Sequence, residues 1–520
     1  MSKHGSRFPS QPPGPGARRR SARGLRRYAV GTAVACGLLL VAPRSSLAAD
    51  FMVQSSVVSQ NYQIRDASDS ALTFLRLDTY LRLFALDLLP KQKDRSKKKR
   101  YETQLHFMAS MRLRADFAGF TSRWNDNVQV AKTEYGGETT FELLFAHLSV
   151  TDIGGVVDLR LGRQFYLGPM EFYGFDGLHA RFKLPYHLAV ELVGGLRNSG
   201  RYAIDAPIFL LDGTDLTDSK PGWLPMFSVA VETRDLSWLS VRLAYRATWH
   251  VLADEGSVLY PDQSTGEGTV PKTQMAEEKL SFYARTNFWK GKLQAFAGIR
   301  YNLLTDRLDE GQFGLASSFG KSSRIQAEYV MESPDFDGDS IFNIFNTQAY
   351  QEVRLWYEHR FTARWRAYAR FTLRLFSGGA SNAPEETEQA LAEPDFGGGL
   401  GFAYVGRKAT ARADLYWQEG YGGRTLGVYG YYRHTLVPRW FAVEARALVA
   451  YWDDELSVTP EGVTAGLALG GRLKLWRRAA IHLLVEDNFG TYSKSDLRIY
   501  ALLNVSWCTW GSCPAGEVVP

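Results

Sequence analysis

The sequence predicts an all-β fold, a single-chain antiparallel β-barrel that crosses a membrane with about 22 strands, within a range of roughly 18 to 22. Three observations predict it. Most of the chain consists of segments in which apolar and polar residues alternate, the connections between these segments differ systematically in length, and the chain begins with a secretory leader.

Residues 1–48 have the pattern of a secretory signal peptide, which leaves 49–520 as the barrel. A polar segment containing Arg26-Arg27 precedes an apolar run from Tyr28 to Ala42, and Ser46-Leu47-Ala48-Ala49 offers small residues for cleavage. A twin-arginine signal at Arg26-Arg27 and a lipid attachment at Cys36 are alternatives that fit the flanking residues less well. The sequence therefore predicts export across the inner membrane.

The basic character of the whole chain belongs mainly to this leader. Nine of the 61 Lys and Arg residues precede Asp50, where no Asp or Glu occurs, so 52 basic residues face 55 acidic ones in the remainder. A chain with that balance has no basic surface suited to nucleic acid. We therefore expect no nucleic-acid partner.

Alternation with a period of two identifies strands whose two faces differ. In the segment from Trp365 to Phe376, one face is apolar, and the other carries Arg366, Tyr368, Arg370, Thr372 and Arg374. The same alternation recurs in Leu72 to Ala85, Tyr101 to Phe117, Leu239 to His250 and Ser495 to Trp507. No run of about 18 apolar residues follows the leader, so membrane crossing by a helix is not expected.

The connections support a barrel independently of the alternation. Short turns are expected near 152–155, 185–187, 235–237, 289–291, 362–364, 406–408, 437–439 and 477–478, and longer polar loops near 119–138, 198–225, 251–276, 332–348 and 378–394. Short and long connections are expected to alternate strictly, as periplasmic turns and outer loops do. This parity places Lys91–Arg100 on the periplasmic side and requires one more strand, from Phe51 to Arg65.

Tryptophans near the ends of the segments fit an aromatic belt at the membrane interface. They are Trp238, Trp249, Trp289, Trp365, Trp440, Trp452, Trp476, Trp507 and Trp510. Several of them lie beside the expected short turns. The partner predicted for this belt and for the apolar face is outer-membrane lipid.

Arginine dominates the polar face, which a barrel turns towards its lumen. The residues predicted to line a substrate path are Arg76, Arg82, Arg112, Arg114, Arg242, Arg246, Arg366, Arg370, Arg374 and Arg498. A row of arginines attracts anions and lowers the barrier to their passage. Acidic residues share this face, so two interpretations remain open: a salt-bridge lattice alone, or a lattice that also forms an anion path.

Motifs for catalysis, zinc or phosphate-loop chemistry do not occur, so neither an enzyme nor a cofactor is expected. Asp335, Asp337 and Asp339 resemble the start of a calcium loop, but Asn346 stands where an EF-hand has Glu, and a solvated acidic turn is favoured. Cys508 and Cys513 allow either a small disulfide loop or two separate thiols.

Two segments resemble porin-like and alginate-export-like outer-membrane barrels. One runs from Leu159-Arg160-Leu161-Gly162-Arg163-Gln164 to Asp176-Gly177, and the other joins Ala327-Glu328-Tyr329 to Asp337-Gly338-Asp339. The resemblance implies passive export of a polysaccharide through an Arg-lined lumen, with periplasmic polysaccharide-export proteins as partners. The arginines would then guide the polymer electrostatically.

These observations together predict a channel in a bacterial outer membrane. Its Arg-rich lumen would pass a secreted polysaccharide or another anionic or polyhydroxyl substrate. A porin for the uptake of small solutes is the first alternative, and a structural or adhesive barrel with a plugged lumen is the second. An enzyme of the membrane rim would need a Ser, His and acid group that no spacing in the sequence suggests.

Overall fold

The computed structural model describes most of the chain between residues 50 and 508. The described residues are 50–66, 71–89, 103–116, 139–198, 224–251, 273–333, 349–376, 394–420, 423–453, 461–476, 478–491 and 493–508. Within them, no helix is long and apolar enough to cross a membrane.

The strands, in chain order, are β1 (Asp50–Asp66), β2 (Ala71–Leu86), β3 (Gln104–Asp116), β4 (Thr139–Ile153), β5 (Val157–Leu167), β6 (Phe172–Leu184), β7 (Leu188–Arg197), β8 (Pro225–Thr233), β9 (Leu239–Val251), β10 (Thr273–Phe288), β11 (Leu293–Asn302), β12 (Arg307–Phe319), β13 (Ser323–Glu332), β14 (Tyr350–Arg360), β15 (Trp365–Phe376), β16 (Asp395–Val405), β17 (Ala409–Gly420), β18 (Gly423–Val437), β19 (Phe441–Asp453), β20 (Glu461–Trp476), β21 (Ala479–Gly490) and β22 (Ser493–Cys508). One 3-10 turn, η2 (Trp289–Gly291), joins β10 to β11.

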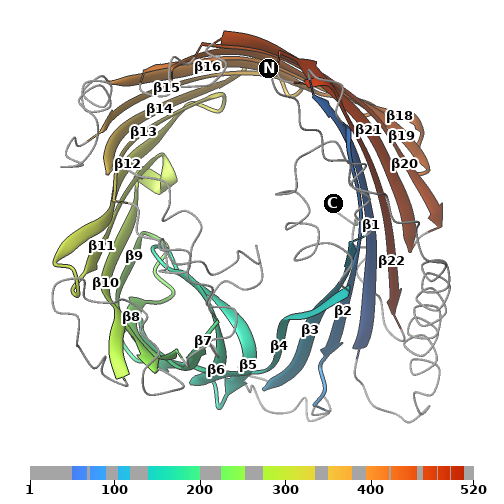
Figure 1. Ribbon diagram of the computed structural model, residues 1–520. Coiled ribbons are helices and arrows are strands. Elements are labelled where there is room, and N and C mark those ends of the chain that lie inside the picture. Colours follow the sequence, from blue (N-terminus) through green and yellow to red (C-terminus); the bar gives the residue numbers. More distant parts are fainter. Residues whose placement is uncertain are drawn as a thin grey trace, which may run out of the picture. The chain divides into compact units, whose positions relative to one another are not determined.

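Each strand pairs antiparallel with the next, and β1 pairs with β22, so the sheet closes into a ring (Figure 1). The closing register runs from Met52 opposite Cys508 to Arg65 opposite Ser495. Closure gives every spanning strand two neighbours for its backbone hydrogen bonds. The predicted fold and count of about 22 are confirmed, including the first strand, which the prediction assigned to Phe51–Arg65.

The connections confirm one expectation and correct another. Short turns join β4 to β5, β6 to β7 and β8 to β9, as predicted. Strict alternation is wrong, because connections at the opposite end of the barrel are also short at 168–171, at 303–306 and between Gly420 and Gly423. Asp306 accommodates one of these turns with a φ of 53°, a left-handed conformation that Asp tolerates.

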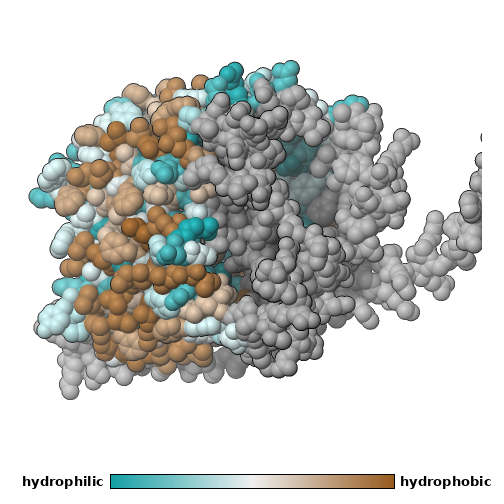
Figure 2. Space-filling model, turned by 60° about the vertical axis from the view of Figure 1, so that its left-hand side comes forward, coloured by the Kyte–Doolittle hydropathy of each residue, from teal (hydrophilic) through white to brown (hydrophobic). Residues whose placement is uncertain are grey.

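The outer face of the ring is apolar. Figure 2 shows the apolar residues gathered in bands over the strands that lie on the left of Figure 1. Exposed tryptophans lie at or beside the short turns, namely Trp238, Trp289, Trp365, Trp440 and Trp476. This arrangement matches the lipid-facing band and interfacial girdle of an outer-membrane barrel.

Three glycines lie in one row across β5, β6 and β7. Gly162 pairs with Gly177, which pairs with Gly195. Gly162 has a φ of +125°, and a Cβ on Gly195 would lie 2.3 Å from the carbonyl oxygen of Asp176. Side chains larger than hydrogen would therefore push these strands apart, so the row permits a close approach that other residues could not make.

We expect Gly195→Ala to destabilise the barrel and Gly194→Ala to leave it almost unchanged. A Cβ on Gly194 meets no atom within 4 Å, whereas one on Gly195 meets the backbone of Asp176 and Gly177 on β6. Overpacking of this kind costs about 1–3 kcal/mol. Urea unfolding of both variants in lipid vesicles, followed by tryptophan fluorescence, measures the difference. Equal midpoints for the two variants would contradict the role of this row.

Candidate functional site

All ten predicted arginines lie in described strands, on β2, β3, β9, β15 and β22. Each occupies a position on the face opposite the exposed apolar residues, as the alternation of Arg242 with the exposed Leu243 illustrates. Side chains on that face point into the ring. The structure thus places the predicted arginines on the lumenal wall, although it separates them into groups with different surroundings.

Four of them are held by acidic neighbours. Arg112 Nε donates to Glu142 Oε2 at 2.8 Å and Arg114 Nε donates to Asp78 Oδ1 at 3.1 Å. Arg374 Nη2 lies 2.8 Å from Glu352 Oε2, and Arg498 Nε donates to Asp496 Oδ2 at 2.9 Å. These pairs link adjacent strands or successive lumenal positions on one strand. They form the salt-bridge lattice that the sequence predicted.

A second group of arginines is exposed to the lumen. Arg82, Arg366 and Arg370 are exposed, and among the described residues none of them has an ion-pair partner. Arg366 lies directly opposite Arg360 in the β14–β15 register, so positive charge accumulates there. Arg76 lies opposite Asp116 in the β2–β3 register and belongs to the same wall. This group can meet a solute in the lumen.

Arg242 and Arg246 are buried instead, with exposed fractions of 7% and 5%. Arg242 contacts Glu232 at 2.6 Å and Glu191 at 2.8 Å. Arg246 Nη2 lies 2.7 Å from Glu277 Oε1. Because each is paired with at least one carboxylate and covered by protein, these two arginines hold the wall together and offer little surface to a solute.

The connection between β5 and β6 explains this burial, because it folds into the ring. Figure 1 shows the end of this hairpin crossing the inside of the barrel towards β9. Arg300 Nη1 on β11 donates to the carbonyl oxygen of Met170 at 3.1 Å, and Gln312 Nε2 on β12 lies 2.8 Å from Met170 Sδ. The hairpin tip is thus bound to strands five or more positions away in the sheet.

Two tyrosines attach the hairpin to the wall. The rings of Tyr166 and Tyr173 stack with centroids 4.8 Å apart. The Tyr166 hydroxyl donates to Glu191 Oε2 at 3.0 Å, and the Arg246 guanidinium lies 4.6 Å from the centre of the Tyr173 ring. Cation–π contacts gain strength when water is excluded, as it is here. We call the hairpin formed by β5 and β6, with its tip at residues 168–171, the inward hairpin. It contacts β7, β9, β11 and β12.

The Gly162-Arg163-Gln164 motif and its partner Asp176-Gly177 lie at the base of the inward hairpin. Arg163 contacts Asp176 through two parallel bonds, Nε to Oδ1 and Nη2 to Oδ2, each 2.7 Å long. Gln164 Nε2 donates to the carbonyl oxygen of Gly177 at 3.1 Å. Such a bidentate pair fixes geometry as well as charge. The motif therefore holds the sharp bend between the wall and the hairpin.

Glu171 at the hairpin tip is an unusual carboxylate. Its side chain is 5% exposed, and neither carboxylate oxygen has a hydrogen-bond partner among the described residues. Burial raises the pKa of Glu171, which lies in the connection between strands, while the nearby Arg246 and Arg300 partly oppose this rise. Sequence reasoning missed Glu171, because nothing in its local sequence shows that the connection turns inward.

The metal candidate is not tested by the structure. Asp335, Asp337 and Asp339 lie outside the described residues. The Asp337-Gly338-Asp339 part of the motif that begins at Ala327 therefore also lies outside them. Within the part of the chain that is described, no group of His, Cys, Asp and Glu side chains could hold a metal ion. Cys508, at the end of β22, is disulfide-bonded, and Cys513 lies outside the described residues.

No protein-family model matches the sequence, and no curated protein matches it significantly. Among solved structures, the chain is similar to OccAB4 of Acinetobacter baumannii, with 8% identity and a TM-score of 0.42 over 90% of this chain and 100% of that one. It is also similar to OccK5 (OpdH) of Pseudomonas aeruginosa, with 10% identity, a TM-score of 0.41 and coverage of 89% and 98%. The chain is also similar to a structure of OpdK from the same organism, solved with vanillate. The identity is 10%, the TM-score is 0.40, and the match covers 89% of this chain and 99% of that one.

Similarity at these identities concerns the fold alone, so the conclusion rests on the chain's own architecture. A closed antiparallel ring, an apolar outer face and a charged interior are the features of a barrel in a bacterial outer membrane. The chain is accordingly a porin-like outer-membrane β-barrel.

Proposed function

We propose that the protein is a channel through which small anionic or polyhydroxyl solutes cross the outer membrane, as in an uptake porin. The observation that carries this proposal is the group of exposed arginines without ion-pair partners among the described residues, Arg82, Arg366 and Arg370. Charge that is not neutralised by a neighbour remains available to concentrate anions in a lumen. The chain would act by conduction and electrostatic guidance, without catalysis.

The inward hairpin favours small solutes over a polymer. It crosses part of the ring and is fastened at its tip by Arg300 and Gln312, which narrows the space for a continuous chain. The Arg163–Asp176 pair gives the Gly162-Arg163-Gln164 motif a structural role, so that motif does not by itself support polysaccharide transport. Export of a polysaccharide with periplasmic partners remains the second candidate.

We further propose that residues 1–48 act as a signal peptide that is removed on export. This follows from the arrangement of basic, apolar and small residues in the leader. Mass spectrometry of the protein purified from outer membranes measures the new N-terminus. An intact leader in the membrane-embedded protein would contradict the proposal.

The purified barrel should conduct ions in a planar bilayer and prefer anions. Replacing Arg366 and Arg370 by Gln should lower the anion-to-cation permeability ratio, because each exposed charge contributes about 0.5 kcal/mol at roughly 8 Å in water. The expected fall for the double variant is about twofold to fivefold. Reversal potentials across a salt gradient give this ratio.

Arg407→Gln is the matched control, since Arg407 is an exposed arginine in the short turn between β16 and β17. It removes the same charge outside the lumenal wall and should leave the ratio unchanged. A wild-type barrel that passes almost no current would instead support a plugged, structural barrel. Equal effects of the control and the double variant would contradict a lumenal anion path.

Deletion of the gene separates uptake from export. If the protein is an uptake porin, the deletion leaves the amount of cell-surface polysaccharide unchanged and slows the entry of a small anionic solute into the cells. A liposome-swelling assay on the purified protein measures permeation of the same solute. Loss of surface polysaccharide, restored by the intact gene, would overturn the uptake proposal in favour of export.

Docking of the inward hairpin should weaken as pH rises. Burial raises the pKa of Glu171, so the docked state favours the protonated carboxyl, and its stabilisation is lost as pH rises through that raised pKa. Glu171→Gln keeps a neutral side chain of the same shape and should remove this pH dependence. Hydrogen exchange in residues 165–175, corrected for intrinsic rates, measures docking between pH 5 and 8. The same pH dependence in both proteins would rule out Glu171 as its cause.

A further inference from the structure

The pairing between β4 and β5 ends part of the way across the barrel wall. Their ladder stops where Ala146 lies opposite Arg163. Beyond that point, residues 139–145 of β4 keep β3 as a neighbour, but among the described residues they have no strand partner on the β5 side. Residues 164–167 of β5 pair with β6 alone. We call this part of the wall, between residues 139–145 and 164–167, the β4–β5 seam.

The seam lies at the level of the lipid-facing band. Phe141 on β4 is 65% exposed and lies opposite Leu113 on β3, which is also exposed on the outer face. Hydrocarbon offers no hydrogen-bond partner to backbone groups on an open strand edge. One such group is satisfied by a side chain, because the carbonyl oxygen of Leu143 accepts from Arg163 Nη1 at 3.0 Å. Arg163 thus lies at the fork where β5 leaves β4.

The inward hairpin packs one of its two faces against the wall behind it. Tyr166, Tyr173 and Phe175 of the hairpin form a buried cluster with Val193 of β7 and Met226 of β8. Neighbouring side chains along a strand point to opposite faces. The other face of the hairpin is therefore directed towards the middle of the ring, as its position in Figure 1 indicates.

That second face of the hairpin is apolar. Phe165, Leu167 and Phe172 lie on it, with exposed fractions of 46%, 82% and 69%. The rings of Phe165 and Phe172 stack with centroids 5.9 Å apart, and Leu167 lies opposite Phe172 in the β5–β6 register. We call these three residues the apolar patch. Exposed apolar residues that cluster in this way are typical of a surface that binds an apolar group.

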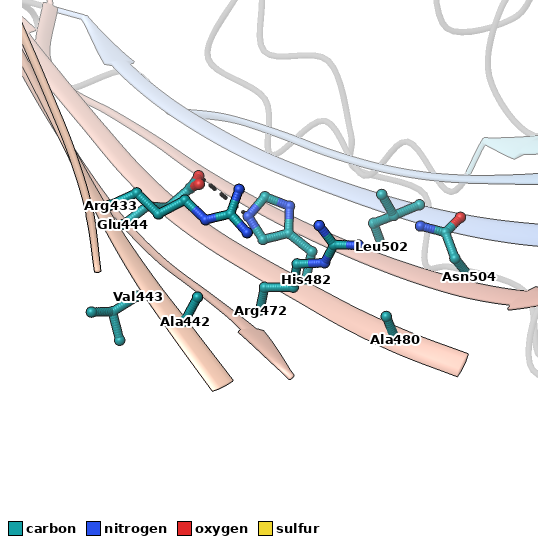
Figure 3. Close-up of a pocket in the computed structure, with 9 residues that line it drawn as sticks. All are labelled: Arg433, Ala442, Val443, Glu444, Arg472, Ala480, His482, Leu502 and Asn504. Carbon is teal, nitrogen blue, oxygen red and sulfur yellow. Dashed lines mark hydrogen bonds and ion pairs between the residues drawn. The ribbon is translucent and has the colours of Figure 1, made fainter. Parts of the chain in front are cut away.

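The patch differs from other parts of the lumenal wall and continues the lipid-facing surface. Figure 3 shows a recess in the wall formed by β18 to β22, where Arg433, Glu444 and His482 bring charged and polar groups together. On the hairpin strands, in contrast, the face that carries the patch also carries Leu161 and Leu178, which are exposed below the seam. One face of β5 and β6 thus leads from lipid into the ring.

Arg163 and Asp176 mark the place where this face leaves lipid. They lie opposite each other, between the Leu161–Leu178 pair and Phe165. Charged side chains seldom face hydrocarbon because their transfer there is costly. Here the two charges are joined by two parallel hydrogen bonds, each 2.7 Å long. The passage from lipid to lumen therefore runs beside the fork of the seam.

We propose that the β4–β5 seam is a lateral passage through which single-chain amphiphiles, compounds with one acyl chain and a polar head group, move between the lumen and the bilayer. The acyl chain would lie along the apolar patch and leave past Phe141, while the head group keeps to the polar side of the fork at Arg163. This function goes beyond the proposed channel for small solutes. It does not require conduction along the axis of the lumen.

Binding is tested by photolabelling of the purified full chain in lipid vesicles with a diazirine-bearing dodecanoate. Mass spectrometry should locate label on Phe165, Leu167 and Phe172, and an excess of plain dodecanoate should compete for it. Leu355 on β14 faces the bilayer, so label there should not be displaced. Label on the patch that plain dodecanoate does not displace would mean that bilayer lipid alone covers it, and would overturn the passage.

The double variant Phe165→Ser with Phe172→Ser removes the apolar surface without adding charge. It should reduce the displaceable label about tenfold, because burial of aromatic surface supplies most of the binding. Leu304→Ser is the matched control, since Leu304 is exposed in the short connection between β11 and β12. Heat-dependent mobility in gels checks that each barrel is folded. Undiminished labelling in a folded double variant, or an equal loss in the control, would overturn the role of the patch.

Entry of radiolabelled dodecanoate into cells separates passage from binding. Cells with the wild-type gene should take it up faster than deletion cells, and the double variant should lose most of this difference. Binding without faster entry overturns the passage. A barrel that conducts anions but neither binds nor admits dodecanoate also overturns the passage and leaves the channel proposal standing. A barrel that admits dodecanoate but passes no current supports the passage and overturns the proposed conduction.

Discussion

The pairing of β1 with β22 is the interaction on which the rest of the structure depends. Hydrocarbon offers no water to backbone N–H and C=O groups, so an open sheet edge in the membrane costs several kcal/mol for each group left unpaired. Closing the ring removes both edges at once. An even number of antiparallel strands also brings the start of β1 at Asp50 and the end of β22 at Cys508 to the same end of the barrel.

Closure also divides the side chains of every strand between lipid and lumen. A charged side chain on the lumenal face must then be paired with an opposite charge or solvated by water. Arg242 and Arg366 illustrate two outcomes for the same residue type on the same face. The inward hairpin covers Arg242, which requires carboxylates from Glu191 and Glu232 to remain charged in a protein environment. Arg366 lies where no described segment covers it, so water solvates it without a partner. The position of the hairpin thus determines which arginines are buried in ion pairs and which are exposed to the lumen.

The sequence was sufficient to predict the strands, because the alternation of apolar and polar residues along a strand does not depend on the tertiary structure around it. It also placed the arginines on the lumenal face. It could not distinguish Arg366 from Arg242, since that difference arises from a hairpin whose tip contacts Arg300, 130 residues along the chain. The glycine row was recognisable in principle from Gly162, Gly177 and Gly195, but their alignment depends on strand register. The expectation of strictly alternating loop lengths failed because the tightly turned outer connections needed no extra residues.

The inward hairpin makes the two sides of the ring different. On the β5–β12 side, the lumen is occupied by the hairpin and its buried ion pairs, which offer a solute little accessible charge. Arg370 and Arg366 lie on β15, and successive lumenal positions along a strand advance about 7 Å, so these two are about 13 Å apart and descend towards the short-turn end. Under the proposed function, a solute attracted by the exposed arginines would therefore move along the β15 wall towards the short-turn end.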